Sequence, residues 1–364
     1  MKAAEAEVKS HVDNKHVVLT KRSDLPKETK VLSSVWSMKR KRRILTREVY
    51  KWKARLNAHG GQQEHGINFW ETYSPVVNWF SIRLFLVISI LRDWETRQID
   101  FVLAFPQADV ECDLYMEIPP GFDLKGQKKE YCPKLEKNIY GTKQAGRVWN
   151  KYLVNKLTEE VGFVQSEVDE CVFYRGKTMY ALYTDDSILA GPDKKEIDNI
   201  ISDMRKAKLE ITEEGELEDF LGVNIEKKPD GTRHLTQPHL IDQILDDLRL
   251  NNKNVMTKKI PALASKILSR HSESEDFNNW FNYRSVIGKL NYFEKNTRSD
   301  ISYITHQCAR FTSNPKVKHA QALKYLGRYL KETRKMGTIL KPVQGMDLEV
   351  YVDAAFVAIG ILKR

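Results

Sequence analysis

Two adjacent carboxylates, Asp185 and Asp186, separate two apolar segments with strand-like composition, residues 178–184 and 187–190. The pair lies where the two-residue connection of a β-hairpin belongs. Carboxylates beside buried strands are costly unless a cation or hydrogen-bond donors lie next to them. Because Asp-Asp is also common in ordinary turns, the pair alone fits a structural turn as well as it fits a metal site.

A third carboxylate, Asp100, interrupts the apolar run of residues 99–105. An Asp in a buried strand must be paired or must bind a metal ion. One Asp on a strand and an Asp pair on a hairpin together predict a two-metal phosphoryl-transfer centre, in which shared carboxylates hold two divalent ions about 3.5–4 Å apart. A metal-dependent nuclease is the weaker alternative, since no further acidic residue has suitable spacing.

Charge is distributed unevenly along the 364 residues, whose formal net charge is +10. Residues 1–60 carry a net +10, residues 61–250 a net −11, and residues 251–364 a net +11. This pattern fits a protein that binds a polyanion with both ends and performs metal-dependent chemistry in its centre. Drift in surface charge is the alternative explanation.

Composition excludes several classes of protein. The chain is 41% hydrophobic and 30% charged, which argues against disorder and low complexity. Its longest apolar stretch, residues 84–91, is far too short for a membrane helix, and its first ten residues do not form a secretory signal. The four cysteines contain no C-x-x-C pair, which argues against a disulfide framework or zinc site and favours a reducing compartment.

Local patterns predict a mixed α+β architecture. The basic run of residues 39–43 lies between two strand-like segments, which predicts a β-hairpin with a basic tip. Helices are expected over residues 81–94, with Ser81 as N-cap, and after Asp193. Further strands are expected at residues 171–174, 178–184, 187–190, 220–225 and 234–236, followed by mostly helical sequence beyond residue 238 that includes a linker over residues 253–272.

The order and spacing of these motifs resemble the reverse transcriptase of copia-type long-terminal-repeat retrotransposons. Tyr183-Thr184-Asp185-Asp186 matches the Tyr-x-Asp-Asp motif of that family, and residues 100–105 match its motif of Asp, four mostly apolar residues and an aromatic. Further matching segments are residues 53–60, 71–77, 81–83, 140–149, 220–222, 235–237, 283–290 and 297–301. The resemblance covers about residues 30 to 357. Gly146 departs from it, because the family usually has Pro there, and glycine loosens the turn that places Gln144.

The resemblance implies a right-hand polymerase of the α+β class, with fingers, a palm containing an antiparallel sheet, and a helical thumb and connection. The expected boundaries are 1–29 for an N-terminal extension, 30–99 for the fingers, 100–235 for the palm with a fingers insertion, 236–345 for thumb and connection, and 346–364 for a truncated start of a ribonuclease H-like domain. Because the sequence stops at Arg364, before the remaining carboxylates of that second site, ribonuclease H activity is not expected.

The resemblance also assigns a metal site. It implies that Asp100, Asp185 and Asp186 are the catalytic residues. Asp100, Asp185 and the backbone carbonyl of Phe101 would bind two Mg²⁺ ions, with Mn²⁺ as an alternative, and Asp186 would support the site.

Five side chains are expected to contact substrate. The resemblance places Lys53 and Arg55 on the triphosphate of the incoming dNTP. Phe105 would exclude a 2′-hydroxyl, although a core aromatic is the alternative. Gln144 would bond the nascent base pair or the dNTP sugar, and Tyr183 would contact the primer strand.

A cluster of basic residues near the C-terminus fits a nucleic-acid contact. Their spacing of +4, +3 and +4 puts four cations on one helix face, opposite Val317, Ala320 and Leu330: they are Lys324, Arg328, Lys331 and Lys335. A solvated helix face is the ordinary alternative. Three neighbouring aromatics have the composition to stack on bases, but core packing is favoured for Trp280, Phe281 and Tyr283.

The expected function is therefore that of an RNA-directed DNA polymerase domain, with an RNA or DNA template–primer and dNTPs as partners and no membrane. A homodimer, or association with other parts of a retrotransposon polyprotein, is left open. The expected location is cytoplasmic or nuclear, in a virus-like particle as for the family, and not secreted. The alternative is an inactive or co-opted remnant that binds nucleic acid. The intact Asp100, Asp185 and Asp186 favour the enzyme, whereas the truncation and Gly146 favour the remnant.

Overall fold

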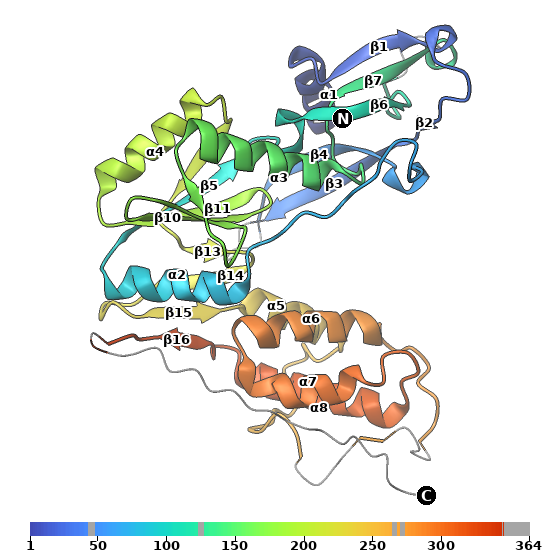
Figure 1. The fold of residues 1–364 in the computed structure, drawn as a ribbon. Helices are drawn as coiled ribbons and strands as arrows, with labels where there is room; N and C mark the ends of the chain where they lie inside the picture. Colours follow the sequence, from blue (N-terminus) through green and yellow to red (C-terminus); the bar gives the residue numbers. More distant parts are fainter. Residues whose placement is uncertain (43–47, 123–126, 264–267, 270–273, 344, 346–364) are drawn as a thin grey trace, which may run out of the picture.

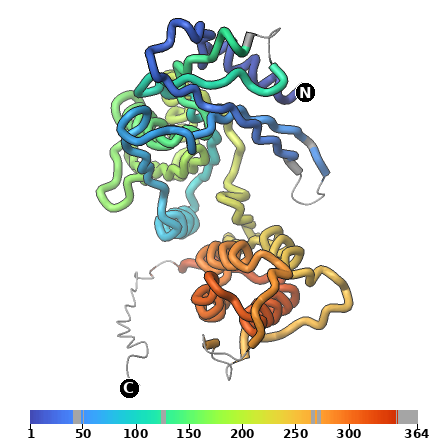
Figure 2. Tube along the Cα trace, turned by 90° about the vertical axis from the view of Figure 1, so that its right-hand side faces the viewer, coloured from blue at the N-terminus to red at the C-terminus, as the bar shows by residue number. Residues whose placement is uncertain are grey.

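The computed structural model describes residues 1–42, 48–122, 127–263, 268–269, 274–343 and 345. Strands and helices are mixed along the chain, which confirms the predicted α+β class. Figure 1 shows a sheet with helix α1 at one end of the molecule, a larger sheet in the middle and four helices at the other end, and Figure 2 shows the same order from the side. No helix in the described ranges is long and apolar enough to cross a membrane.

The sheet at the N-terminal end has four strands in the order β1-β7-β6-β2 in the described chain. Their bounds are Val17–Lys21 for β1, Tyr131–Lys137 for β7, Asp109–Met116 for β6 and Val31–Leu32 for β2. Helix α1, Lys2–Asp13, packs against a neighbouring strand, β4. Residues 1–29, which we expected to be an extension, therefore contribute a helix and an edge strand to this part of the fold.

The predicted basic hairpin is present. Strand β3 covers Ser34–Arg42 and pairs with β4, Val49–Ala58, while the expected tip at residues 43–47 lies outside the described residues. The hairpin extends away from the rest of the N-terminal region (Figure 2). Pairing places Lys39 opposite Lys53 and Ser37 opposite Arg55. Since side chains alternate along a strand, Lys53 and Arg55 lie on the same face of the hairpin.

The central sheet is antiparallel, with described strands in the order β12-β5-β11-β10-β9-β8. Its strands are β5, Glu95–Phe101; β8, Val164–Gln165; β9, Val172–Arg175; β10, Thr178–Tyr183; β11, Asp186–Gly191; and β12, Ile211–Gly215. Three helices share its core: α2, Trp79–Leu91; α3, Ala145–Asn155; and α4, Lys194–Lys206. Strands β10 and β11 are almost fully buried, which explains why residues 178–183 and 187–190 are mostly apolar.

Two predicted boundaries around the carboxylates are wrong. The hairpin turn consists of Thr184 and Asp185, because Tyr183 pairs with Asp186, so that Asp186 is already the first residue of β11. Thr184 adopts a positive φ of 57°. Strand β5 ends at Phe101, and the rest of the apolar run forms a turn in which Leu103 also has a positive φ, of 47°.

Helix α2 begins two residues earlier than predicted. Asn78, not Ser81, is its N-cap and accepts a hydrogen bond from Phe80 N at 2.9 Å. The Ser81 hydroxyl instead donates to the Asp169 carboxylate at 2.6 Å. The predicted cap at Asp193 is confirmed, since its carboxylate accepts from Lys195 N at 2.8 Å.

A third sheet joins the central region to the C-terminal helices. Its described order is β13-β14-β15-β16, with bounds Asp219–Phe220, Val223–Lys227, Arg233–Thr236 and Thr338–Leu340. Strand β16 was not predicted: residues 338–340 return from the helical region and pair with β15. Short helical turns elsewhere are η1, Arg22–Asp24; η2, Gly60–Gln62; η3, Phe105–Gln107; η4, Gln127–Lys129; the π-helix η5, Lys156–Glu160; and η6, Ser299–Ile301.

The C-terminal helices form a second hydrophobic core. They are α5, Pro238–Asp247; α6, Tyr283–Asn296; α7, Ser302–Ala309; and α8, Val317–Glu332. The described residues of the predicted linker, 253–272, contain neither helix nor strand. The Arg83 guanidinium of α2 donates to the carbonyls of Lys295 and Asn296 at the end of α6, which connects this core to the central region.

Candidate functional site

The central sheet brings the three predicted carboxylates together at one end of its inner strands β5 and β11. Asp100 is the penultimate residue of β5 and is the register partner of Asp186 in β11. Asp185 lies in the adjoining turn, and its carbonyl accepts a hydrogen bond from Phe101 N at 3.3 Å. Adjacent strands thus place side chains 85 or more positions apart in the sequence at the same end of the sheet.

Several negative groups lie around Asp186 in this cluster. Burial raises the pKa of Asp186 to about 6, and the nearby Asp185, Asp100, Glu214 and Asp219 raise it further. All the charges that shift this pKa are negative, so a cation beside Asp186 would be strongly favoured.

Carboxylate oxygens are the ligands that hard divalent cations such as Mg²⁺ prefer, so the donor set fits such an ion. As the side chains stand, no group of three or more His, Cys, Asp or Glu within the described ranges is arranged to hold a metal ion. The fold thus brings the three carboxylates to the same end of strands β5 and β11.

Trp149 of α3 supports the turn that carries Asp185. Its indole Nε1 donates to the carbonyl of Thr184 at 2.7 Å, and its ring lies edge-on to Phe101 with ring centroids 5.0 Å apart. Trp149 is only 1% exposed. One buried side chain therefore contacts both the hairpin turn and the end of β5.

Gln107 fixes the loop that follows Asp100, a role that the sequence did not reveal. Its Nε2 donates to the carbonyls of Val102 at 2.8 Å and Glu210 at 3.0 Å, and its Oε1 accepts from Glu210 N at 3.0 Å. The partner lies 103 positions away, so no local pattern could have indicated the contact. This clamp sets the position of Phe105, which begins η3.

Tyr140 lies at the meeting point of three predicted site residues. Its ring centroid is 4.9 Å from that of Phe105, and the guanidinium carbon of Arg55 lies 4.4 Å from the centre of the Tyr140 ring. Burial raises the pKa of Tyr140 to about 12; Arg55 opposes this shift, while Asp185 and Asp100 add to it. Arg55 and Phe105 therefore lie beside the carboxylates, with Tyr140 between them.

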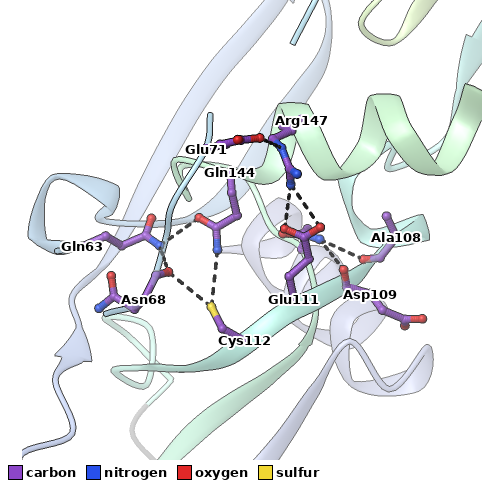
Figure 3. A network of polar contacts seen from close by, with 10 residues as sticks. Gln63, Asn68, Glu71, Ala108, Asp109, Glu111, Cys112, Gln144 and Arg147 are labelled. Carbon is purple, nitrogen blue, oxygen red and sulfur yellow. Dashed lines mark hydrogen bonds and ion pairs between the residues drawn. The ribbon is translucent and has the colours of Figure 1, made fainter. Parts of the chain in front are cut away.

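Gln144 does not join Arg55, Phe105 and Tyr140 beside the carboxylates. Its side chain is 2% exposed, its Oε1 accepts from Gln63 Nε2 at 2.9 Å, and its Nε2 lies 4.0 Å from Cys112 Sγ (Figure 3). Gln63 also donates to the carbonyl of Asn68 at 3.0 Å. The amide that we expected to reach a substrate is instead part of a buried network, as Figure 3 shows. Its partner Gln63 is 81 positions away, so the sequence could not have shown this.

Gly146 does not explain the burial of Gln144. A Cβ at position 146 would meet Ser74 Cβ at 3.7 Å, which is ordinary contact. The backbone carbonyl of Gly146 accepts from the Ser74 hydroxyl at 3.2 Å. Nearby, Arg147 bonds Glu111 at 2.8 Å and Glu71 at 3.2 Å, which fixes the start of α3 from the outside (Figure 3).

Tyr183 ends β10 and lies toward the C-terminal region. It is partly buried against the central core, and burial together with the neighbouring Tyr183 phenol raises the pKa of Tyr292 of α6. The Tyr292 hydroxyl donates to the carbonyl of Leu221, at the turn between β13 and β14. Tyr183 therefore lies near the place where the third sheet meets α6.

Three of the four C-terminal cations lie in α8, at the other end of the molecule from the N-terminal sheet, whereas the carboxylates belong to the central sheet (Figure 1). The prediction of one helix face is wrong for Lys335, because α8 ends at Glu332. Lys331 has a structural role: its Nζ donates to the carbonyls of Leu250 and Asn252, at 3.2 and 2.5 Å.

The other two cations line a cavity of about 820 Å³ formed by α8, Ile304 of α7 and the segment that contains residues 261–263 and Leu268. Lys324 and Arg328 contribute to its wall together with Pro261, Leu263 and Tyr325. The Lys324 ammonium also lies 5.1 Å from the ring centre of Trp280. Trp280 is 39% exposed, whereas Phe281 and Tyr283 are buried in the helical core, which confirms core packing for those two.

Comparison with known proteins gives the family. Residues 19–264 match the family described as reverse transcriptase (RNA-dependent DNA polymerase). The retrovirus-related Pol polyprotein from transposon RE1 of Arabidopsis thaliana is 35% identical over 308 residues, 84% of this chain and 20% of that protein. The corresponding polyprotein from transposon TNT 1-94 of Nicotiana tabacum is 32% identical over 344 residues, 92% of this chain and 25% of that protein. The chain thus spans a fifth to a quarter of the length of these relatives.

A solved structure of a foamy viral protease-reverse transcriptase in complex with double-stranded DNA is 11% identical to this chain. The match covers 93% of this chain and 48% of the viral chain, with a TM-score of 0.48. The family assignment rests on the sequence matches, which agree with the motifs around Asp100 and Asp185. The chain belongs to the reverse transcriptase (RNA-dependent DNA polymerase) family, and its relatives are Pol polyproteins of copia-type retrotransposons, as its motifs predicted.

Proposed function

We propose that this chain is an active RNA-directed DNA polymerase domain, which transfers a nucleotide from a dNTP to the 3′-hydroxyl of a primer. One observation carries the proposal. Asp100, Asp185 and Asp186 meet at one end of the inner strands of the central sheet, and Arg55 lies on Tyr140, on which Asp185 and Asp100 also act. The boundaries of fingers, palm and thumb remain part of the same proposal, at residues 30–99, 100–235 and 236–345.

The carboxylates would bind the metal ions. Asp100, Asp185 and the backbone carbonyl of Phe101 would hold two Mg²⁺ or Mn²⁺ ions, with Asp186 beside them. When bound, these ions lower the pKa of the primer hydroxyl and neutralise charge on the departing pyrophosphate. The protein orients the reacting groups, and the hydrogen bond from Trp149 to Thr184 holds the turn that carries Asp185.

Arg55 and Lys53 would bind the triphosphate. Both lie on one face of the β3–β4 hairpin, and Lys39 lies opposite Lys53 in the adjoining strand. A triphosphate bound on this face would be attracted by these neighbouring cations. Within the described ranges, the buried Nε of Arg55 has no hydrogen-bond partner, and a guanidinium can bond two phosphate oxygens at once.

The template and primer would be bound by the basic regions that flank the acidic centre. Residues 1–60 and 251–364 carry net charges of +10 and +11. A protein that neutralises several phosphates loses affinity steeply as salt rises. Lys324 and Arg328 remain candidate phosphate contacts, while Lys331 is occupied by backbone carbonyls.

Primer extension tests the proposal. The chain is incubated with an RNA template, an annealed DNA primer, dNTPs and Mg²⁺, and the wild type is compared with Asp185→Asn. Asp13→Asn is the matched control, because Asp13 is an exposed carboxylate at the end of α1. We expect Asp185→Asn to lower the extension rate at least a hundredfold, and Asp13→Asn to leave it unchanged.

Equal and negligible extension by wild type and Asp185→Asn would show that the chain is not an active polymerase. Salt-dependent binding of the template–primer by that inactive protein would support the alternative, a remnant that binds nucleic acid.

A further inference from the structure

The position of Tyr140 is fixed by a close contact between two backbone segments. Tyr140 follows β7, and its carbonyl accepts a hydrogen bond from Ala58 N at 2.9 Å, at the end of β4. The next residue, Gly141, has a φ of +93°, and a Cβ there would lie 2.2 Å from the Ala58 carbonyl oxygen. Only glycine allows this approach, so the turn is held tightly against the strand that carries Arg55.

The Tyr140 ring connects groups from three separate parts of the chain. Phe105 of η3 packs against it at 4.9 Å with a tilt of 48°, and the Arg55 guanidinium of β4 lies 4.4 Å from its centre. The carboxylates of Asp185 and Asp100 are close enough to act on its hydroxyl. A nucleotide with its triphosphate on Arg55 and its sugar on Phe105 would therefore also contact Tyr140.

Gln144 is not available for the same contact. It is 2% exposed, and its amide is bonded to Gln63 (Figure 3). Gln63 in turn accepts a hydrogen bond from Lys143 N at 2.7 Å, so the network of Gln63 and Gln144 holds the turn that begins at Tyr140. To reach a substrate, Gln144 would have to leave this network and lose a buried hydrogen bond, which costs free energy.

We propose that Tyr140, and not Gln144, makes the polar contact to the sugar of the incoming nucleotide and supports Phe105 in excluding a 2′-hydroxyl. Gln144 has a structural role, because it stabilises the turn that begins at Tyr140 through Gln63. This inference rests on the proposed polymerase function.

Single-nucleotide incorporation measures the proposed role. The rates of dTTP and UTP incorporation opposite the same template adenine give KM and kcat for each nucleotide. Tyr140→Phe removes only the hydroxyl, so we expect KM for dTTP to rise roughly three- to tenfold with little change in kcat. Tyr140→Ala also removes the support of Phe105, so we expect the preference for dTTP over UTP to fall at least roughly tenfold.

Two controls separate this role from a general loss of structure. Tyr174→Phe and Tyr174→Ala change an exposed tyrosine of β9 and should leave both nucleotide parameters unchanged. Gln144→Ala should lower the urea midpoint of unfolding, while the folded variant keeps its KM for dTTP within about threefold of wild type. If Gln144→Ala raises KM more than tenfold at unchanged stability, or if both Tyr140 variants keep wild-type KM and selectivity, the assignment is overturned.

A binding experiment distinguishes failure of this inference from failure of the polymerase proposal. With a dideoxy-terminated primer, dNTP-dependent resistance of the protein–nucleic acid complex to a heparin challenge reports nucleotide binding without turnover. If wild type makes no product but forms this complex, and Tyr140→Phe weakens it at least threefold, the inference holds although the polymerase proposal fails. If wild type neither extends the primer nor forms the complex, both are overturned. If wild type extends the primer and Tyr140→Phe forms the complex as well as wild type, only the inference is overturned.

Discussion

Replacing Trp149 by phenylalanine tests whether the turn that carries Asp185 depends on a single buried hydrogen bond. The substitution removes the indole Nε1 that donates to the carbonyl of Thr184 at 2.7 Å, and it leaves an aromatic ring beside Phe101. A carbonyl left without its buried partner costs about 1–3 kcal/mol. The smaller ring leaves a cavity that adds about 1–2 kcal/mol, so we expect a total loss of about 2–4 kcal/mol in the free energy of unfolding.

Urea unfolding, followed by far-UV circular dichroism, measures this loss. Trp70→Phe is the matched control, because Trp70 is 53% exposed and its replacement should change the unfolding free energy by less than about 0.5 kcal/mol. Primer extension by the folded Trp149→Phe variant should also fall, since the Asp185 turn loses a constraint. A Trp149→Phe variant with the same urea midpoint and slope as the Trp70→Phe control would refute the reasoning.

Three further perturbations have defined outcomes. Gly141→Ala forces a Cβ against the Ala58 carbonyl at a φ of +93°, so it should lower the free energy of unfolding in urea by about 2–4 kcal/mol. The control Gly176→Ala has a φ of +58° in open space and should lower it by about 1 kcal/mol. Equal losses in the two variants would contradict the close contact at Gly141. Burial and the nearby His11 lower the pKa of His16 to about 4. As the pH falls below 6.5, His16 is therefore protonated in the unfolded chain before it is protonated in the folded protein. The free energy of unfolding should therefore fall by up to about 1.4 kcal/mol per pH unit as the pH drops from 6.5 towards 4, and a His16→Leu variant should lose part of this slope. Burial raises the pKa of the Cys171 thiol to about 12, so this thiol should resist a thiol reagent at pH 8 until urea unfolds the protein; rapid labelling of the native chain would contradict its burial.

The carboxylates could be found from the sequence because each interrupts a run that is otherwise apolar. Asp100 lies in an apolar run at the end of β5, and Asp185 lies in the turn between the buried strands β10 and β11, so both stand out from their neighbours. The register of the hairpin could not be found in the same way. Moving the turn by one residue, from 185–186 to 184–185, leaves the local composition almost unchanged, and the pairing of Tyr183 with Asp186 decides between the two.

The features that the sequence did not indicate depend mostly on contacts between residues far apart in the sequence. The burial of Gln144 depends on Gln63, and the pairing of β16 with β15 joins segments about a hundred residues apart. Tyr140 was recognised only as part of a motif, because its neighbours Arg55 and Phe105 come from other elements. Helix periodicity also extended the basic face to Lys335, although the helix ends before it.

The pairing of β15 with β16 has a consequence for how the helical region is attached. Thr338 lies opposite Leu235, so the chain enters and leaves helices α5 to α8 at neighbouring points of one sheet. The helical region is thus an insertion between two paired strands. Its two ends are separated only by the distance between adjacent strands, whatever the length of the insertion. Added or deleted residues within the helical region leave that distance unchanged, and the entropic cost of closing the loop rises only slowly with its length.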